Sequence, residues 1–442
     1  MTNELEPVLS VEAAQERVLA AAGRPLPTEE VALEAALGRV LAETVRSGVD
    51  LPPWDNSSMD GFAVHAADVA SATQAAPVRL RVLGEVRAGG SPDVEVPAGC
   101  AVRIATGARV PASADAVVPV ENTMIAGSDQ VRSPGFEAGE PPPESCLVAA
   151  AVTRGAYIRR RGDDIRAGTP VLEPGSRLGP AQIAMAAAAG AGVVGVHRKP
   201  VAGVLSTGDE LRSFGQPLGE SGIPDANRPG LLAMCRAAGA DVLDLGIAAD
   251  SLDAVLAVVR PAIEHLDLLI VSGGVSVGPY DVVRSAFESI GRVDLWRVAV
   301  QPGKPFAFGR SRPRIRDGRQ VLLFGLPGNP VSALVTFELF VKPALHRIVG
   351  VRTPALDTDR AVTEDELSKA PGRRGYLRVT VARDGRGSPT RDEMGRLRVR
   401  RAGGQGSHML GAMAAADALA IVPEAADRIE AGGEVEILWL RT

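Results

Sequence analysis

The sequence predicts an α/β protein organised around a doubly wound domain, with a β-rich inserted domain and a small C-terminal β domain. Between residues 201 and 348, short apolar runs typical of buried strands alternate with longer runs of helical periodicity. Residues 77–151 and 351–442 contain short β-type runs separated by glycine, proline and polar turns. The chain has 442 residues, which is enough for about three domains.

The N-terminal part of the chain is expected to contain two helices and a loop. Ser10 can cap a helix over 11–22, and Gly23 can end it. Thr28 can cap a second helix, because apolar residues recur after it at helical spacing. These residues are Val31, Leu33, Ala36 and Leu37. The segment 51–61 is polar and broken by proline, so we expect an ordered loop there.

The inserted β-rich domain and the loop before it offer two candidate binding positions. Strands are expected over 78–83 and 116–120. Thr106 stands among small residues, where a ligand can approach the backbone. Asp60 carries a carboxylate on the preceding loop, although its Asp-Gly pair is also typical of a simple turn. The segment 132–145 is rich in Pro, Gly and Glu and is expected to be a surface loop.

The segment that follows this domain contains a third candidate, Asp164. Three arginines and two carboxylates occupy residues 159–164, which fits either a solvated turn with weak ion pairs or a site. Gly179 and Pro180 then predict the start of an alanine-rich helix, and Gly190 predicts its end.

The doubly wound domain is expected to contain five strands and four helices. The expected strands are 201–206, 242–245, 268–271, 295–300 and 321–325. The expected helices are 228–238, 252–265, 282–290 and 331–348. In domains of this kind, ligands bind outside the carboxyl ends of the strands.

Each of these strands is followed by polar residues or glycines. The segments are Thr207-Gly208-Asp209-Glu210, Asp250, Ser272-Gly273-Gly274 with Asp281, Pro302-Gly303-Lys304-Pro305, and Pro327-Gly328-Asn329-Pro330. We expect carboxylates, a lysine and glycine-opened backbone to meet on one rim. An anionic ligand with a divalent metal would need such a rim, and carboxylate oxygens favour a hard ion such as Mg²⁺.

The motif on which this expectation depends most runs from Asp267 to Asp281. A short apolar strand leads into Ser272-Gly273-Gly274, and a helical pattern resumes at Val282, which together predict an anion-binding loop. The glycines could equally serve a tight strand-to-helix connection that binds nothing. Gly274-Val275-Ser276-Val277-Gly278 also matches the nucleophile elbow of α/β-hydrolases. We reject that interpretation because Ser276 lies five residues beyond the strand instead of at the turn itself.

The composition argues against several classes of function. The net charge is −5 and only 3% of the residues are aromatic, so we expect no nucleic-acid partner. The three scattered cysteines, Cys100, Cys146 and Cys235, indicate neither disulfides nor structural zinc. We see no secretory signal and no apolar run of the ~20 residues that a membrane span needs, so we expect a cytoplasmic protein without membrane contact.

Seven motifs occur in the order in which they are found in the molybdopterin molybdenumtransferases. They are PPWDNSSMDGFAV (52–64), ATGA (105–108), STGDEL (206–211), SGGVSVGPYD (272–281), PGKPFAFG (302–309), LPGNPVSA (326–333) and GQGSH (404–408). The chain resembles this family, which includes the C-terminal domain of gephyrin, over nearly its whole length. The resemblance implies a molybdopterin-binding α/β domain (1–26 and 195–350), a linking domain (27–55 and 151–194), an inserted β-rich domain (56–150) and a C-terminal β-barrel domain (351–442).

The resemblance also implies a reaction, in which molybdate is inserted into adenylylated molybdopterin and AMP is released. The implied catalytic residues are Asp60, Asp164, Glu210, Asp250, Asp281 and Lys304, of which Glu210, Asp250 and Asp281 would hold Mg²⁺. The implied cofactor-binding residues are Thr106, Ser272, Gly273, Gly274, Pro327, Asn329, Pro330, Ser332, Arg378 and Ser407. The family implies a homodimer, in which the partner subunit supplies Asp60 and Thr106. A molybdopterin adenylyltransferase and molybdoenzymes are candidate partners.

The sequence departs from the family pattern near the implied oxyanion site. Gln301 and Arg297 stand where lysines are common in relatives, so Gln301 removes one positive charge. Two alternative functions stay open at this point. A molybdopterin adenylyltransferase would need only the α/β domain, and a non-catalytic scaffold of the gephyrin type would tolerate loss of the acidic rim. The sequence does not distinguish molybdenum from tungsten as the metal.

Overall fold

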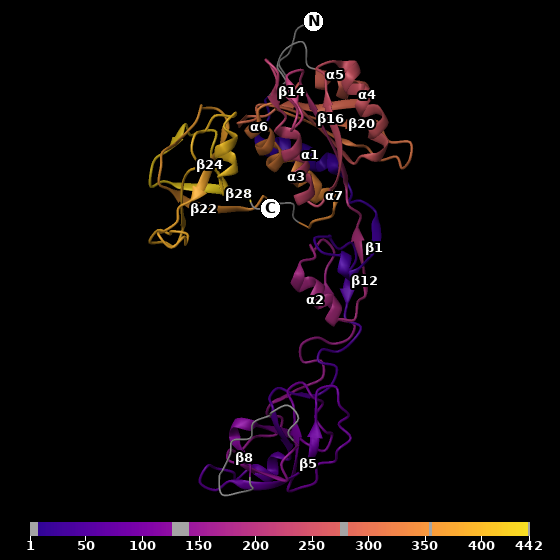
Figure 1. Cartoon of the computed structure of the whole chain (residues 1–442), viewed down its shortest axis with the longest axis vertical. Coiled ribbons are helices and arrows are strands. Elements are labelled where there is room, and N and C mark those ends of the chain that lie inside the picture. Colours follow the sequence, from indigo (N-terminus) through magenta and orange to yellow (C-terminus); the bar gives the residue numbers. More distant parts are fainter. Residues whose placement is uncertain (1–7, 126–140, 275–281, 353–355, 441–442) are drawn as a thin grey trace.

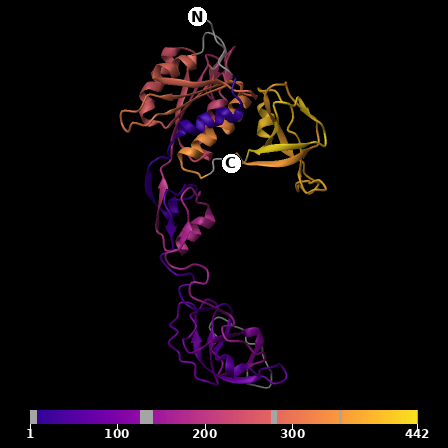
Figure 2. The same ribbon diagram turned by 180° about the vertical axis from the view of Figure 1, so that it is seen from behind.

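The chain is elongated and forms a series of bodies along one axis (Figure 1). A computed structural model describes residues 8–125, 141–274, 282–352 and 356–440. The α/β domain lies at one end with the C-terminal β domain beside it, and the inserted β-rich domain lies at the opposite end (Figures 1 and 2). A narrow linking body joins the two ends. Among the described residues, no helix is long and apolar enough to cross a membrane.

The α/β domain is built on a six-stranded mixed sheet. Its strands, in spatial order, are β16 (Asp241–Ala248), β13 (Val201–Thr207), β17 (Leu268–Ser272), β21 (Leu322–Leu326), β20 (Pro305–Ser311) and β18 (Gly291–Arg297). The first four strands are parallel, and β20 and β18 are added antiparallel to their neighbours. Residues of β17 alternate between the two faces: Leu268 and Ile270 pack in one core, and Leu269 and Val271 pack in the other.

Helices cover both faces of this sheet, as the doubly wound prediction requires. One face is covered by α1 (Val11–Ala22), α3 (Asn227–Ala237), α6 (Pro330–Thr336) and α7 (Lys342–Ile348), with a π-helical turn at Phe337–Val341 between the last two. The other face is covered by α4 (Leu252–Ala262) and α5 (Val282–Ile290). The predicted helix over 331–348 is therefore interrupted, although its direction is kept.

The first predicted helix is confirmed, and the second is wrong. The Ser10 hydroxyl accepts a 3.1 Å hydrogen bond from the backbone N–H of Ala13, and Gly23 ends α1 with φ +67°. Thr28–Ala32 instead forms strand β1, followed by a 3₁₀ turn at Leu33–Ala35. Strand β1 pairs antiparallel with β12 (Val193–His197). Glu30, at the centre of β1, is paired with Gly195, so a strand 165 residues away in sequence overrides the local helical pattern.

The linking body consists of short antiparallel pairs and one helix. The pairs are β1 with β12, β2 (Val45–Arg46) with β11 (Pro170–Leu172), and β3 (Asn56–Ser57) with β10 (Ile158–Arg159). Helix α2 (Pro180–Ala188) starts at the predicted Gly179-Pro180. The small core contains Leu33, Leu41, Leu178, Ala186, Val194 and Val196. The chain therefore crosses this body twice, once outward and once on its return. The domain boundaries stay a proposal, and β12 runs across the one placed between 194 and 195.

The inserted domain is a six-stranded sheet at the end of the elongated molecule that lies opposite the α/β domain. Its strands, in spatial order, are β7 (Ala116–Pro119), β4 (Gly61–Val64), β6 (Cys100–Ile104), β5 (Val78–Val86), β9 (Ser145–Val148) and β8 (Thr123–Ile125). Buried residues such as Phe62, Val64 and Val118 pack on one side, and Val102, Ile104 and Val117 pack on the other. The predicted strands over 78–83 and 116–120 are both present.

The C-terminal domain is a closed barrel attached to the α/β domain by a shared strand pair. Its strands are β22 (Thr358–Thr363), β24 (Arg374–Val381), β25 (Leu397–Arg401), β26 (Ala418–Val422) and β28 (Glu434–Trp439), and pairing of β24 with β26 closes the sheet. Strand β19 (Val300–Gln301) pairs with β24. The expected strand over 295–300 is therefore wrong in its bounds: β18 ends at Arg297, and Val300 already belongs to the barrel sheet. Strand β20 was not predicted, because Pro302 and Pro305 suggested a loop.

Candidate active site

The carboxyl ends of the parallel strands meet at one edge of the sheet, as predicted. Ser206 is in register with Ser272, and Ser272 is in register with Leu326. The loops that carry Asp250, Gly273 and Pro327 therefore leave the sheet side by side.

The glycine turn after β17 is required by close packing of backbone. Gly273 has φ +96°, and a Cβ at this position would lie 2.2 Å from the carbonyl oxygen of Thr207. Its N–H donates a 3.2 Å hydrogen bond to the Leu326 carbonyl, and Gly274 has φ +61°. Close packing thus explains why glycine is needed at 273, independently of any ligand that the loop binds. Ser276 and Asp281 lie outside the described residues.

A buried polar network holds the rim together from beneath. Asn227, at the start of α3, donates 2.8 Å hydrogen bonds from Nδ2 to Ser272 Oγ and to the Gly328 carbonyl. The Ser272 hydroxyl in turn donates to the Pro327 carbonyl at 3.4 Å. One side chain of α3 therefore fixes the loops after β17 and β21 in relation to each other.

Carboxylates gather at the end of β13, on the same rim. The Thr207 hydroxyl donates to Asp250, and the Asp250 N–H donates to Asp209 Oδ1 at 3.2 Å. Glu210 lies back over its own loop, since a Cβ on Gly208 would come 2.8 Å from Glu210 Oε2. Asp250 therefore contacts the loop after β13 through Asp209, and Glu210 belongs to the same loop. Among the described residues, no group of three or more His, Cys, Asp or Glu side chains forms a metal-binding cluster.

A cleft between the α/β domain and the barrel brings together predicted residues from both. Its volume is about 460 Å³. The predicted residues that line it are Lys304, Asn329, Ser332, Arg378 and Ser407, and Gln301 lines it as well. The backbone N–H of Val331, next to Pro330, donates to the Ser407 carbonyl at 3.2 Å. This contact and the β19–β24 pairing fix the two walls of the cleft.

Arg378 is a fully buried cation with unused hydrogen-bond donors. Its exposed fraction is 0%, and Nη2 donates to the carbonyls of Gly404 and Gly406 at 2.9 and 3.0 Å. Within the described structure, its Nε and Nη1 have no partner, and burial lowers the pKa of its guanidinium. A buried charge without a counter-ion is costly, so this wall of the cleft is suited to an anion. The Gln301 Oε1 is also buried without a described partner.

Three predicted residues lie away from this cleft within one chain. The backbone N–H of Thr106 donates a 2.7 Å hydrogen bond to Asp60 Oδ1, so these two form a pair in the inserted domain. The Asp164 N–H donates to the Leu51 carbonyl at 3.0 Å in the linking body. The inserted domain lies at the far end of the chain from the α/β domain (Figure 1). A single chain thus does not bring these residues to the cleft.

Comparison with known families covers most of the chain. Residues 9–190 match the family described as MoeA N-terminal region (domain I and II), 203–347 match the probable molybdopterin binding domain, and 360–440 match the MoeA C-terminal region (domain IV). The molybdopterin molybdenumtransferase of Haemophilus influenzae is 33% identical over 431 residues, which is 97% of this chain and 98% of that protein. This chain belongs to the molybdopterin molybdenumtransferase family.

Other relatives and a solved structure agree with this assignment. The molybdopterin molybdenumtransferase of Bacillus subtilis is 34% identical over 94% of this chain and 90% of its own length. The crystal structure of the molybdopterin biosynthesis MoeA protein from Pyrococcus horikosii has a TM-score of 0.76 and 31% identity, covering 99% of this chain and 100% of that one. The predicted multidomain α/β fold with a C-terminal β-barrel is therefore confirmed.

Two residues that build the site were not among the residues predicted from the sequence. Asn227 ties the rim loops together, and a polar residue opening the helix after β13 is the signal that could have indicated it. Gln405 exchanges two hydrogen bonds of 2.8 and 3.0 Å with the backbone of Arg378 and so positions that arginine. Its place within GQGSH was the available signal.

Proposed function

We propose that this protein inserts molybdate into adenylylated molybdopterin with release of AMP, which yields molybdenum cofactor. The observation that carries this proposal is the buried Arg378, whose Nε and Nη1 donors have no described partner in a cleft shared by the α/β domain and the barrel. A tetrahedral dianion in that cleft would use these donors. The names of the relatives over nearly the full chain support the same activity.

The residues of the cleft suit the two substrates in different ways. Arg378, Lys304 and the Ser407 hydroxyl line one cleft and would hold molybdate through charge and hydrogen bonds. The loop of Ser272, Gly273 and Gly274, on the rim of the sheet, would bind the phosphates of the adenylylated pterin, with the Gly274 backbone N–H as the donor, because the Gly273 N–H already donates to the Leu326 carbonyl. The dithiolene of the pterin supplies the sulfur ligands of the metal, so no cysteine cluster is needed. Water would cleave the phosphoanhydride, so that AMP leaves and the phosphate of the pterin is restored. The two dithiolene sulfurs would replace oxygens of molybdate, which leave as water with the thiol protons.

Mg²⁺ fits the carboxylates of the rim. Mg²⁺ in phosphate-handling sites takes one or two carboxylates together with substrate phosphates and water, so a dedicated protein cage is not required. We propose that Asp250 and Glu210, with Asp281, would hold it. When bound, it would polarise the phosphoanhydride and neutralise charge on the leaving phosphate. Asp250 is already oriented for this role by the Thr207 hydroxyl.

We further propose that the working unit is a homodimer, in which Asp60 and Thr106 of each chain complete the cleft of its partner. Their hydrogen-bonded pair, far from the cleft of their own chain, supports this arrangement. A two-fold dimer would repeat the contact twice. We expect the enzyme to act in the cytoplasm, after a molybdopterin adenylyltransferase and before the molybdoenzymes that receive the cofactor. The adenylyltransferase and scaffold alternatives are not favoured, because neither gives a role to the cleft between the α/β domain and the barrel.

The experiment that tests the function is release of AMP from adenylylated molybdopterin by purified protein, with and without molybdate. We expect release to require molybdate and Mg²⁺, and Arg378→Lys to raise the KM for molybdate at least about tenfold, because lysine cannot reproduce the guanidinium geometry. Arg383→Lys, an exposed arginine of the barrel, is the matched control and should not change the KM. AMP release that needs neither molybdate nor Mg²⁺ would contradict the mechanism. Tungstate in place of molybdate addresses the choice of metal.

A further inference from the structure

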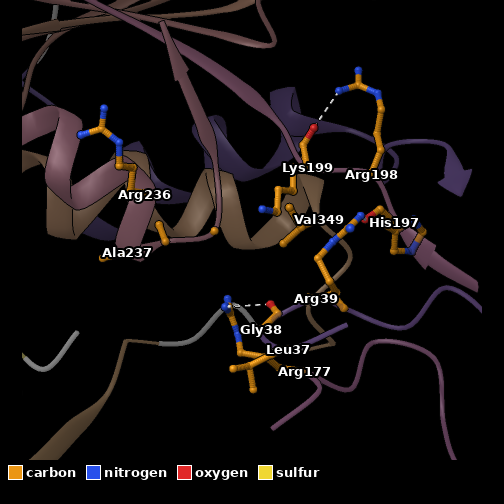
Figure 3. Close-up of a pocket in the computed structure, with 13 residues that line it drawn as sticks. Leu37, Gly38, Arg39, Arg177, His197, Arg198, Lys199, Arg236, Ala237 and Val349 are labelled. Atoms are coloured by element: carbon orange, nitrogen blue, oxygen red, sulfur yellow. Dashed lines mark hydrogen bonds between the residues drawn. The ribbon is translucent and has the colours of Figure 1, made fainter. Parts of the chain in front are cut away.

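A second pocket lies where the linking body meets the α/β domain (Figure 3). Its volume is about 210 Å³, and we call it the junction pocket. The linking body contributes 37–40 and Arg177, and the α/β domain contributes the end of α3 and Val349. Of the described residues that line it, none is acidic and five are lysine or arginine. These five are Arg39, Arg177, Arg198, Lys199 and Arg236.

Two of the five cations are already neutralised by carboxylates. Arg39 forms an ion pair with Glu29. Arg198 is bound in bidentate fashion by Asp267, at 2.7 and 2.8 Å. Both guanidinium groups are therefore engaged in fixing the chain around the pocket.

Arg177 and Lys199 have no strong ion pair among the described residues, so their positive charge can still attract an anion. Arg177 has no carboxylate within 4 Å among the described residues, and its Nη1 donates to the Gly38 carbonyl at 3.3 Å. Lys199 has an ion pair with Asp241 at 3.8 Å, between side chains that are 47% and 64% exposed. Such an exposed pair contributes little. Figure 3 shows that Lys199 and Arg177 extend toward the pocket from opposite walls, whereas Arg236 points away from it.

The C-termini of two helices explain the presence of only some of the five cations at the junction pocket. Helices α3 and α7 both end at the pocket, and cations are favoured at helix C-termini. This accounts for Arg236, which is in the last turn of α3. Arg177 comes from the linking body, and its guanidinium reaches across to α3, since a Cβ on Gly239 would lie 3.8 Å from its Nη1. Like charges brought together from separate elements repel each other unless an anion lies between them.

We propose that the junction pocket binds a small phosphate-class anion, held by Arg177 from the linking body and Lys199 from the α/β domain. Pockets for drug-sized ligands occupy about 300–1,000 Å³, so this smaller volume suits inorganic phosphate or pyrophosphate better than a nucleotide. The two residues belong to different bodies, and a bound anion would therefore tie the linking body to the α/β domain. This site is separate from the cleft around Arg378.

Isothermal titration of the full chain with inorganic phosphate and with pyrophosphate tests this proposal. Ionic strength is held constant with sodium chloride. We expect saturable binding by the wild type, and about tenfold weaker binding by Arg177→Gln and by Lys199→Gln, because each loses one charge-assisted contact. Arg177→Lys should recover part of the loss. The matched control is Arg260→Gln, which replaces an exposed arginine in the last turn of α4 and should bind like the wild type.

Two results would overturn the proposal: no saturable binding by the wild type, or equal binding by the wild type and both variants. The second result would mean that the anion binds elsewhere, for example beside Arg378. Circular dichroism confirms that each variant is folded. Lys199 is half-exposed and provides an independent variant if Arg177→Gln does not fold.

Discussion

Thr106 and Asp60 form a hydrogen-bonded pair, in which the Thr106 backbone N–H donates to Asp60 Oδ1 at 2.7 Å. The two residues come from different loops of the inserted domain, 46 positions apart in sequence. The family resemblance led us to expect both at the active site, yet their own chain holds them at the opposite end from the cleft with Lys304 and Arg378. This separation leads directly to the first prediction.

Asp60→Ala and Lys304→Ala should each be inactive alone but should complement each other when subunits exchange. Equal mixing makes about half of the dimers mixed, and each mixed dimer holds one intact cleft and one doubly damaged cleft. AMP release should therefore recover to roughly a quarter of the wild-type rate per chain. Native mass spectrometry verifies the exchange. Mixed dimers without any recovered activity would place both residues in a cleft within one chain.

Gly273→Ala should destabilise the α/β domain strongly. The added Cβ would lie 2.2 Å from the backbone oxygen of Thr207, which cannot move without distorting β13, and φ is +96°. We expect a loss of about 2–5 kcal/mol in the free energy of unfolding, measured in urea. Gly215→Ala is the matched control, because Gly215 has φ +81° with no atom within 4 Å of the added Cβ. It should lose only about 1–2 kcal/mol. Equal losses would show that the close approach to Thr207 does not matter.

Gln301→Lys should strengthen molybdate binding. The Gln301 Oε1 is buried without a described partner in the cleft, where a carbonyl oxygen would face an incoming anion. A lysine adds a positive charge, and we expect the KM for molybdate to fall about fivefold, which corresponds to about 1 kcal/mol. The control is Gln320→Lys, an exposed site outside the cleft. An unchanged or higher KM in Gln301→Lys would mean that the glutamine amide already serves the anion.

His346 should make the protein less stable in mild acid. Burial, together with the charges of Arg177 and Lys342, lowers its pKa from 6.5 to about 4. Between these values the unfolded chain binds a proton that the folded chain does not, so stability is fully present above pH 6.5 and falls as the pH drops toward 4. The loss should reach about 3 kcal/mol. The free energy of unfolding, measured in urea at a series of pH values from 7 to 4, should fall less steeply with decreasing pH in His346→Gln than in the wild type. His265→Gln changes an exposed histidine and should keep the pH dependence of the wild type.

Cys146 and Cys235 should resist thiol reagents in the folded protein. Burial raises the pKa of each thiol to about 12, and the reactive species is the thiolate. Cys100 is half-buried. At pH 8 we expect one thiol per chain to react quickly in the native state and three after denaturation. Fast reaction of a second thiol in native protein would reveal opening of the core around it.

The sequence predicted the parts of the fold that rest on local patterns. Strand β17 is a continuous apolar run up to Ser272, and α1 has both its cap and its stop. The predictions from the sequence were wrong where pairing with a distant strand decides the secondary structure. Thr28–Ala32 has helical spacing and becomes a strand because β12 pairs with it, and Val300–Gln301 joins the barrel sheet through β24.

The same distinction applies to the site. Lys304, Ser332 and Ser407 stand in recognisable motifs, and the structure brings them to one cleft with Arg378. The burial of Arg378 and the bracing role of Asn227 depend on contacts between distant segments, so no local pattern contains them. The junction pocket likewise arises from five separate segments that meet only in the folded chain.

The packing of α1 bears on how the chain folds as it is synthesised. Gln15 of α1 donates a 3.0 Å hydrogen bond to the carbonyl of Leu339, 324 residues later. At roughly 5–20 residues per second, a ribosome needs on the order of 15–65 s to reach that partner. During this interval the apolar face of α1 has no native surface to cover it, while the inserted domain, encoded between the two halves, can already fold. Factors that shield a nascent α1 would therefore influence the yield of this protein more than they would for a chain with contiguous domains.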